Sequence, residues 1–144
     1  MENNHPTKDN QPTKLKYIGV WFLTGIISNV LQRIADLFLA EALISDFNDL
    51  TNYFIGGSVA YVLITVGVLI FIYNIFSTLN MKKVFPYIVV LGGLGTLAGM
   101  GQVTGLYSGL NIDLTVFYSS TIIGFIVAVF LVRSYYIGKP ERWY

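Results

Sequence analysis

LTNYFIGGSVAYVLITVGVLIFIYNIFSTLNM, residues 50–81, decides the fold class, because it contains no Asp, Glu, Lys or Arg. Residues 84–112 and 114–132 are also free of these residues, and a fourth apolar stretch begins at Tyr17. A helix that crosses the hydrocarbon core of a bilayer needs about 20 mainly apolar residues. Only 12% of the 144 residues are charged, against about 25% in a soluble domain. The sequence therefore predicts an all-α integral membrane protein, an antiparallel four-helix bundle.

The predicted transmembrane domain covers residues 17–133, with helices at about 17–39, 53–76, 84–106 and 114–133. A flexible tail is predicted at 1–16, and an interfacial tail at 134–144, where basic and aromatic residues suit the headgroup region. A membrane β-barrel is disfavoured, because its short strands would alternate apolar and polar residues. A cleaved signal peptide is disfavoured, because about ten residues separate the first apolar run from the candidate cleavage site.

Basic residues are predicted on one side of the membrane. That side receives eight of the nine Lys and Arg residues, namely Lys8, Lys14, Lys16, Lys82, Lys83, Arg133, Lys139 and Arg142. The other side receives Arg33 with Asp36, Glu41, Asp46, Asp49 and Asp113. Because Lys and Arg mark the cytoplasmic side, both termini are predicted in the cytoplasm, with the bundle in the inner (plasma) membrane. The strong bias also argues against a dimer of oppositely inserted copies.

Small residues recur at four-residue spacing in two predicted helices. The third helix carries Gly101, Gly105 and Gly109 on one face and Gly95 and Gly99 on another, and the second helix carries Gly56 and Ala60. Small residues at this spacing let membrane helices approach closely. We expect helices to pack at these positions. The first interpretation is that the packing occurs within the bundle, and the second is that it occurs between copies of the chain.

The first predicted helix carries a polar stripe. Its members are spaced four residues apart and share one face: Thr24, Ser28, Gln32 and Asp36, with Asn29 and Arg33 on an adjacent strip. The opposite face is apolar and can meet lipid. The polar face must therefore turn toward protein or trapped water.

Polar groups of the other helices are predicted at the same depth, in the outer half of the bundle. The resulting pocket would bind a small ligand through Asn29, Gln32, Arg33, Asp36, Tyr53, Tyr61, Gln102 and Tyr118. Arg33 would contact an anionic or carbonyl group of that ligand. Two alternatives stay open. In the first, residues 33–45 form a short interfacial helix, with Arg33 paired to Asp36 or reaching the headgroups. In the second, the polar stripe lines a transport path.

Catalytic and cofactor chemistry has no support in the sequence. The chain has no cysteine, and its one histidine, His5, lies in the N-terminal tail. No serine has a His or Lys neighbour at helical spacing that would act as a base. Haem and metal ions lack a set of ligands, and nucleic-acid binding has no support beyond a few tail lysines. We expect no enzymatic activity, no cofactor and no metal.

Two short motifs carry a resemblance to a known family. Phe54-Ile55-Gly56-Gly57 opens the second predicted helix, and GMGQVTGLYSG, residues 99–109, closes the third. With four helices and cytoplasmic termini, these motifs resemble the DoxX-like superfamily, and most of all its small bacterial members of unknown function. That group often has an aromatic-Gly-Gly and a Gly-Arg at these places. Here Ile55 is inserted and Gln102 replaces the arginine, so an arginine-dependent site does not carry over.

The resemblance implies a four-helix antiparallel bundle over residues 17–133 and implies no enzymatic activity. Together with the residues, it leads to a prediction of function: an accessory subunit, or a binder of a small lipid-like ligand, in contact with the lipid bilayer. A small transporter or channel is one alternative. A purely structural subunit of a larger membrane complex is another, and it predicts that a partner chain covers the third helix.

Overall fold

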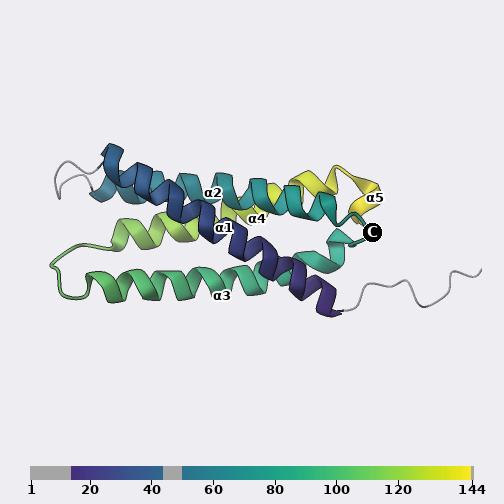
Figure 1. The fold of residues 1–144 in the computed structure, drawn as a ribbon, viewed down its shortest axis with the longest axis horizontal. Coiled ribbons are helices and arrows are strands. Elements are labelled where there is room, and N and C mark those ends of the chain that lie inside the picture. Colours follow the sequence, from purple (N-terminus) through teal and green to yellow (C-terminus); the bar gives the residue numbers. More distant parts are fainter. Residues whose placement is uncertain (1–13, 44–49, 144) are drawn as a thin grey trace, which may run out of the picture.

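The structure is a computed structural model that describes residues 14–43 and 50–143, and all regular structure in that part of the chain is helical. The elements are α1 (Lys14–Leu43), α2 (Leu50–Ile75), α3 (Met81–Tyr107), α4 (Thr115–Ile137) and the short α5 (Pro140–Trp143). The four long helices lie alongside one another (Figure 1) and are long and apolar enough to cross a membrane. The predicted all-helical class with four apolar helices is confirmed.

The helices extend beyond most of the predicted limits, and local hydrogen bonds lie at several of their ends. The Asn80 side chain accepts a hydrogen bond from the Lys83 N–H at 3.2 Å and so caps the start of α3. Asp113 accepts one from the Thr115 N–H at 2.9 Å at the start of α4. At the other end of α4, the Gly138 N–H donates to the carbonyl of Ser134 at 3.3 Å. The chain then turns into α5, where the sequence predicted only a tail. Of the flexible tail predicted at 1–16, residues 14–16 instead form the start of α1. Residues 1–13, with His5, and residues 44–49, with Asp46 and Asp49, lie outside the described residues.

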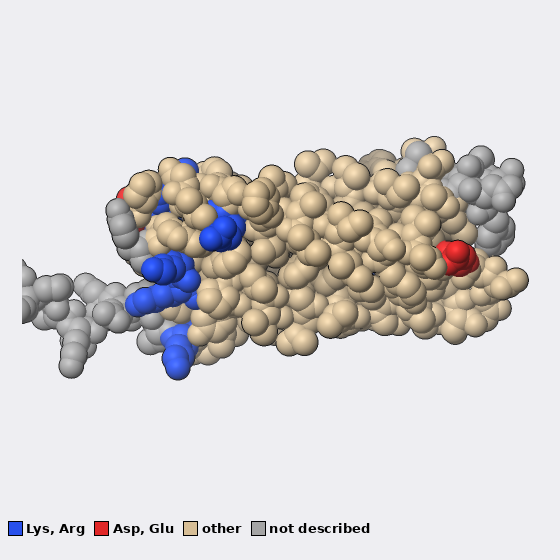
Figure 2. Space-filling model, turned by 180° about the vertical axis from the view of Figure 1, so that it is seen from behind, with Lys and Arg blue, Asp and Glu red and all other residues tan. Residues whose placement is uncertain are grey.

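Successive long helices run in opposite directions, and one end of the bundle is basic. Lys14, Lys16, Lys82, Lys83, Lys139 and Arg142 lie at the start of α1, the start of α3 and the C-terminal segment. We call this the basic end, and the opposite end, where α1 stops and α3 connects to α4, the distal end. Figure 2 shows Lys and Arg gathered at the basic end and a middle without charge on that face. Contacts join the three segments there: the Lys16 Nζ donates to the Thr78 Oγ1 at 3.1 Å, and the Trp143 and Phe85 rings lie 5.8 Å apart.

The four long helices do not pack evenly. α2 packs mainly against α1 and α4, whereas α3 packs mainly against α4. α1 crosses the bundle obliquely (Figure 1): Tyr17 near its start stacks on Tyr87 of α3 at 6.0 Å, whereas Gln32 near its end reaches the carbonyl of Gly57 in α2. α1 therefore leaves α3 and approaches α2 as it runs toward the distal end.

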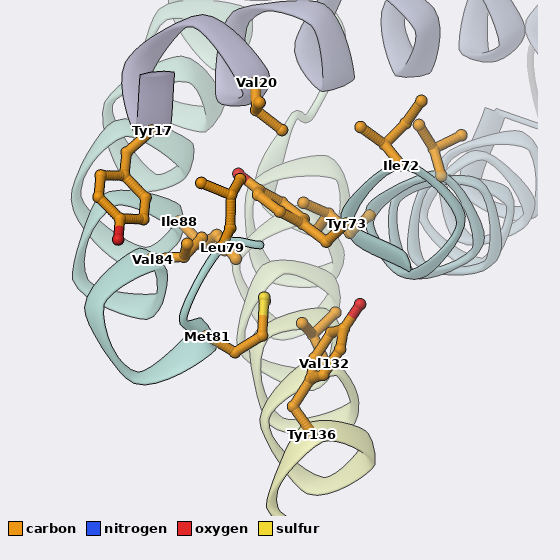
Figure 3. Close-up of a cluster of buried hydrophobic side chains, with 12 residues drawn as sticks. Tyr17, Val20, Ile72, Tyr73, Leu79, Met81, Val84, Ile88, Val132 and Tyr136 are labelled. Atoms are coloured by element: carbon orange, nitrogen blue, oxygen red, sulfur yellow. The ribbon is translucent and has the colours of Figure 1, made fainter. Parts of the chain in front are cut away.

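The apolar core lies toward the basic end. Its members come from all four long helices and the α2–α3 connection (Figure 3): Tyr17, Val20, Ile72, Tyr73, Leu79, Met81, Val84, Ile88, Val132 and Tyr136. Outside the core, large apolar side chains such as Leu63 and Phe130 are exposed by more than 60%. Such extensive apolar exposure is unusual for a soluble protein and fits a surface that faces lipid.

Candidate functional site in the distal half

The polar stripe of α1 turns inward, as its spacing predicts. Thr24 is only 3% exposed, and its hydroxyl donates to the carbonyl of Val20 at 2.8 Å, one turn back. Farther along, the Gln32 Nε2 donates to the Asp36 Oδ1 at 2.9 Å and lies 3.4 Å from the Gly57 carbonyl oxygen of α2. The stripe therefore faces α2, and one of its amides binds the carboxylate of its own helix.

Two atoms of the stripe are buried without a hydrogen-bond partner among the described residues. They are the Ser28 Oγ and the Gln32 Oε1, which lie one helical turn apart on the same face. A buried polar atom without a partner costs about 1–3 kcal/mol of stability. An additional hydrogen-bonding group would therefore stabilise the stripe most if it bonded to these two atoms.

Hydroxyl groups of the other helices pair with one another across the bundle. Ser58 of α2 donates to Ser120 of α4 at 2.9 Å. Tyr61 of α2 pairs with Thr96 of α3 at 3.3 Å. Such bonds between membrane helices are worth on average about 0.6 kcal/mol each. They connect neighbouring helices in the half of the bundle that lacks the apolar core.

One more polar pair and an aromatic cluster complete the distal half. The Tyr118 hydroxyl of α4 bonds to the Thr104 hydroxyl of α3. Phe54 of α2 is 5% exposed, and its ring centre lies 5.3 Å from that of Phe117 and 6.3 Å from that of Tyr107. Sequence reasoning did not predict the contact between Phe54 and Phe117. The sequence signal for it is an aromatic residue near the start of α2 and another near the start of α4, two helices that begin at the same end of the bundle.

The eight predicted ligand-binding residues differ in burial and in their hydrogen bonds. Gln32, Asp36, Tyr53, Tyr61 and Tyr118 are half-buried, and all but Tyr53 form hydrogen bonds within the bundle. Asn29, Arg33 and Gln102 are exposed. No ion pair joins Arg33 to Asp36 in the described part of the chain, although the two lie within one turn of α1. Three of the eight residues, Gln32, Tyr61 and Tyr118, contact a neighbouring helix, and the ligand pocket stays a prediction.

The glycines of α3 separate into two groups. Gly92 and Gly93 pack against Phe125 of α4, and a Cβ built at Gly92 would lie 3.1 Å from the ring carbon Cε2. A Cβ built at any glycine farther along α3, or at Gly109 just past its end, would meet nothing within 4 Å: Gly95, Gly99, Gly101, Gly105 and Gly109. We call these five the open glycines of α3. They make no close approach to another helix of the described chain, which corrects the first interpretation of their spacing.

The remaining small residues of the predicted packing motif lie in α2, where Gly56 and Ala60 are half-buried. Gly124 of α4 also approaches another helix closely and is buried. A Cβ there would lie 3.4 Å from the Val62 Cγ2 and 3.6 Å from the Ser58 carbonyl oxygen of α2. Close packing of α2 and α4 thus occurs at Gly124, which belongs to a four-residue repeat of small residues in α4, Ser120, Gly124 and Ala128, that sequence reasoning missed.

The described residues contain no group of three or more His, Cys, Asp or Glu side chains that would hold a metal ion. Comparison of the sequence with models of known protein families gave no match, and neither curated proteins nor solved structures gave one. The resemblance to the DoxX-like superfamily therefore stays a prediction. Inference about function rests on the geometry of this chain alone.

Proposed function

We propose that this protein is a non-enzymatic accessory subunit of a membrane complex, and that a helix of another chain covers the open glycines of α3. One observation carries the proposal: a Cβ added at any of these five positions would lie more than 4 Å from every other helix of the described chain. Small residues serve in membranes to bring helix backbones together, because packing rather than hydrophobicity drives their association. Their exposed position on α3 favours a partner outside this bundle.

Gln102 supports the same interpretation. It lies between Gly101 and Gly105 in sequence, is exposed, and shows no hydrogen bond to another described residue. An amide that faces hydrocarbon without a partner is costly, and polar side chains within membranes usually turn toward protein. A partner helix that presents a polar side chain would satisfy the Gln102 amide while packing against the glycines beside it.

Site-specific crosslinking tests the proposal. Because the chain has no cysteine, any crosslink formed through a thiol of this chain must involve the one introduced cysteine. Gly105→Cys places a thiol among the open glycines, and Leu63→Cys is the matched control on the exposed apolar surface of α2. We expect an adduct with a second chain from native membranes for Gly105→Cys and none for Leu63→Cys. A single adduct of twice the chain mass would identify a second copy, and another mass would identify a different subunit. Equal yields from both positions would contradict the proposal.

Binding of a small lipid-like ligand is the second candidate, and the unpartnered Ser28 Oγ and Gln32 Oε1 favour it. A ligand hydroxyl beside them would donate to the amide oxygen and accept from the serine. Native mass spectrometry of the purified protein and of Ser28→Ala tests this. We expect a bound small molecule that Ser28→Ala retains less well. Equal retention by both proteins would contradict this candidate. Transport along the stripe has less support, because Gln32 reaches the backbone of α2.

We further propose that the basic end faces the cytoplasm of a bacterial cell, with the bundle in the inner membrane. The gathering of Lys and Arg at one end of the described chain supports this orientation, since positive residues are retained on the cytoplasmic side. Membership of the DoxX-like superfamily remains part of the same proposal. Reporter fusions at the C-terminus and in the α3–α4 connection test the orientation. We expect activity typical of the cytoplasm from the C-terminal fusion alone. Such activity from the α3–α4 fusion alone would show that the bundle is inserted in the opposite orientation.

A further inference from the structure

An apolar groove lies on α3 near the basic end. It has a volume of about 280 Å³ and is lined by Pro86, Tyr87, Val90 and Leu91. These residues are two pairs spaced four apart, so they form two parallel rows on one side of the helix. The exposed surface of the groove is almost wholly apolar. It therefore suits a hydrocarbon chain rather than a polar solute.

A pair of lysines stands directly above this groove. Lys82 precedes Pro86 by four residues and Lys83 precedes Tyr87 by four, so each lysine continues one of the two rows toward the basic end. The rise along the helix from each lysine to the groove is about 6 Å. Both lysines are exposed, and neither ammonium group pairs with a carboxylate among the described residues. Two positive charges are thus held at headgroup level, one turn above an apolar channel.

The wall of the groove is held in place by the core. Tyr17 of α1 is 6% exposed and stacks on the Tyr87 ring, with the two planes only 4° apart. Ile88, next to Tyr87 in sequence, is part of the buried core shown in Figure 3. Because α1 and the core fix this part of α3, the rows of lysine and apolar residues keep their spacing without a ligand. A preformed site loses less conformational entropy when it binds.

We infer that this surface binds one anionic phospholipid, with the phosphate between Lys82 and Lys83 and an acyl chain along Val90 and Leu91. The opposite charge of a phosphate complements the lysine pair, and the apolar groove below it selects a lipid over a free phosphate ion. The inference rests on the four helices crossing a membrane. It is independent of the proposed partner on α3, whose contact surface lies among the open glycines in the other half of that helix.

Lipid titration of the full-length protein, followed by native mass spectrometry, tests the inference. The probes are phosphatidylglycerol, phosphatidylcholine and inorganic phosphate. Lys82→Gln and Lys83→Gln each remove one charge from the site, and Arg133→Gln is the matched control, because Arg133 is also exposed near the basic end but lies on α4. Since one basic residue near an anionic surface is worth about 1 kcal/mol, each lysine variant should weaken phosphatidylglycerol binding on the order of fivefold. Arg133→Gln should leave it unchanged.

A further variant, Val90→Trp, fills the groove without altering charge, and Val90 is exposed by 59%, so the bundle should still fold. We expect it to weaken phosphatidylglycerol binding while both lysines remain. Inorganic phosphate should not displace the lipid, and phosphatidylcholine should bind less tightly. Equal losses in Arg133→Gln and the lysine variants would overturn the inference in favour of a general surface charge. Displacement by inorganic phosphate, or unchanged binding by Val90→Trp, would overturn it as well.

Discussion

Replacing Gly105 by leucine tests how the open glycines of α3 are used. A Cβ built at Gly105 meets nothing within 4 Å, and the residue is exposed. The larger side chain therefore has room in the isolated chain. Glycine within a helix is less stable than alanine by roughly 0.5–1 kcal/mol, because it loses more backbone freedom on folding. We expect Gly105→Leu to leave the unfolding free energy of the isolated chain unchanged or to raise it by up to about 1 kcal/mol.

Association with the proposed partner should respond in the opposite direction. If another helix packs against Gly105, four added carbon atoms overfill that contact. Overpacking of a close-packed contact costs about 1–3 kcal/mol. Since about 1.4 kcal/mol corresponds to a tenfold change in affinity, this cost weakens association by about 5- to 150-fold.

Gly92→Leu is the matched control in the same helix. The built Cβ lies 3.1 Å from the Phe125 Cε2, so the added side chain meets α4 of its own chain. We expect this variant to destabilise the isolated chain by about 1–3 kcal/mol through overpacking. The comparison separates a face that packs inside the bundle from a face that packs against another chain.

Two measurements decide the outcome. Unfolding of each purified variant in detergent gives the stability of the isolated chain, and energy transfer between labelled chains or co-purification from native membranes gives association. Gly105→Leu should lose association and keep stability, and Gly92→Leu should lose stability. A loss of stability in Gly105→Leu as large as that in Gly92→Leu would refute the packing argument. Unchanged association in a stable Gly105→Leu protein would refute the proposed role of this face.

Three further predictions concern groups whose surroundings are defined. Tyr73 is fully buried and its hydroxyl has no partner among the described residues, so Tyr73→Phe should keep or raise the unfolding free energy, by up to about 1 kcal/mol; a clear loss in thermal unfolding would contradict this. A double-mutant cycle of Ser58→Ala and Ser120→Ala should give a coupling of about 0.6 kcal/mol, and zero coupling would exclude a bond between the two hydroxyls. Hydrogen bonds from the Thr115 hydroxyl and, next in size, from its N–H lower the pKa of Asp113. The ionised Asp113 should therefore stabilise the start of α4 at any pH above the ordinary carboxyl pKa. This stabilisation should be lost as the pH falls through the lowered pKa. Nuclear magnetic resonance titration of the Asp113 carboxyl checks this, and a normal pKa would contradict it.

The apolar helices could be predicted because their signal is local. The absence of charge from residues 50–81 requires no knowledge of other segments, and α2 occupies that stretch. The inward face of α1 could be predicted for a similar reason, since helical periodicity alone places Thr24, Ser28 and Gln32 on one side. The oblique course of α1 could not be predicted, because it depends on how Tyr17 packs against α3 and Gln32 against α2.

The polar contacts show a second limit of sequence reasoning. Depth along each helix predicts that Tyr61 and Tyr118 lie in the same half, but depth does not distinguish a residue that lines a pocket from one that bonds to a neighbouring helix. That distinction depends on which residue lies opposite, here Thr96 and Thr104 of α3. The same limit applies to the open glycines, whose spacing favours close packing without saying which chain supplies the second helix.

The two halves of the bundle are held together differently, and this difference bears on where a partner would bind. At the basic end, side chains such as Met81, Val84 and Val132 are fully buried, and each gains the full free energy of apolar packing. In the distal half the described connections include hydroxyl pairs and one aromatic cluster, each worth about 1 kcal/mol, together with the Gln32–Gly57 contact and the packing of Gly124 against α2. In the distal half of α3, the described contacts include the Thr104–Tyr118 hydroxyl pair and the Tyr107–Phe54 ring contact, whereas the α3 residues of the buried core all lie near the basic end. A helix packed on the open glycines would stabilise that half most, so binding of a partner should protect the backbone amides of distal α3 from hydrogen exchange more than those near the core.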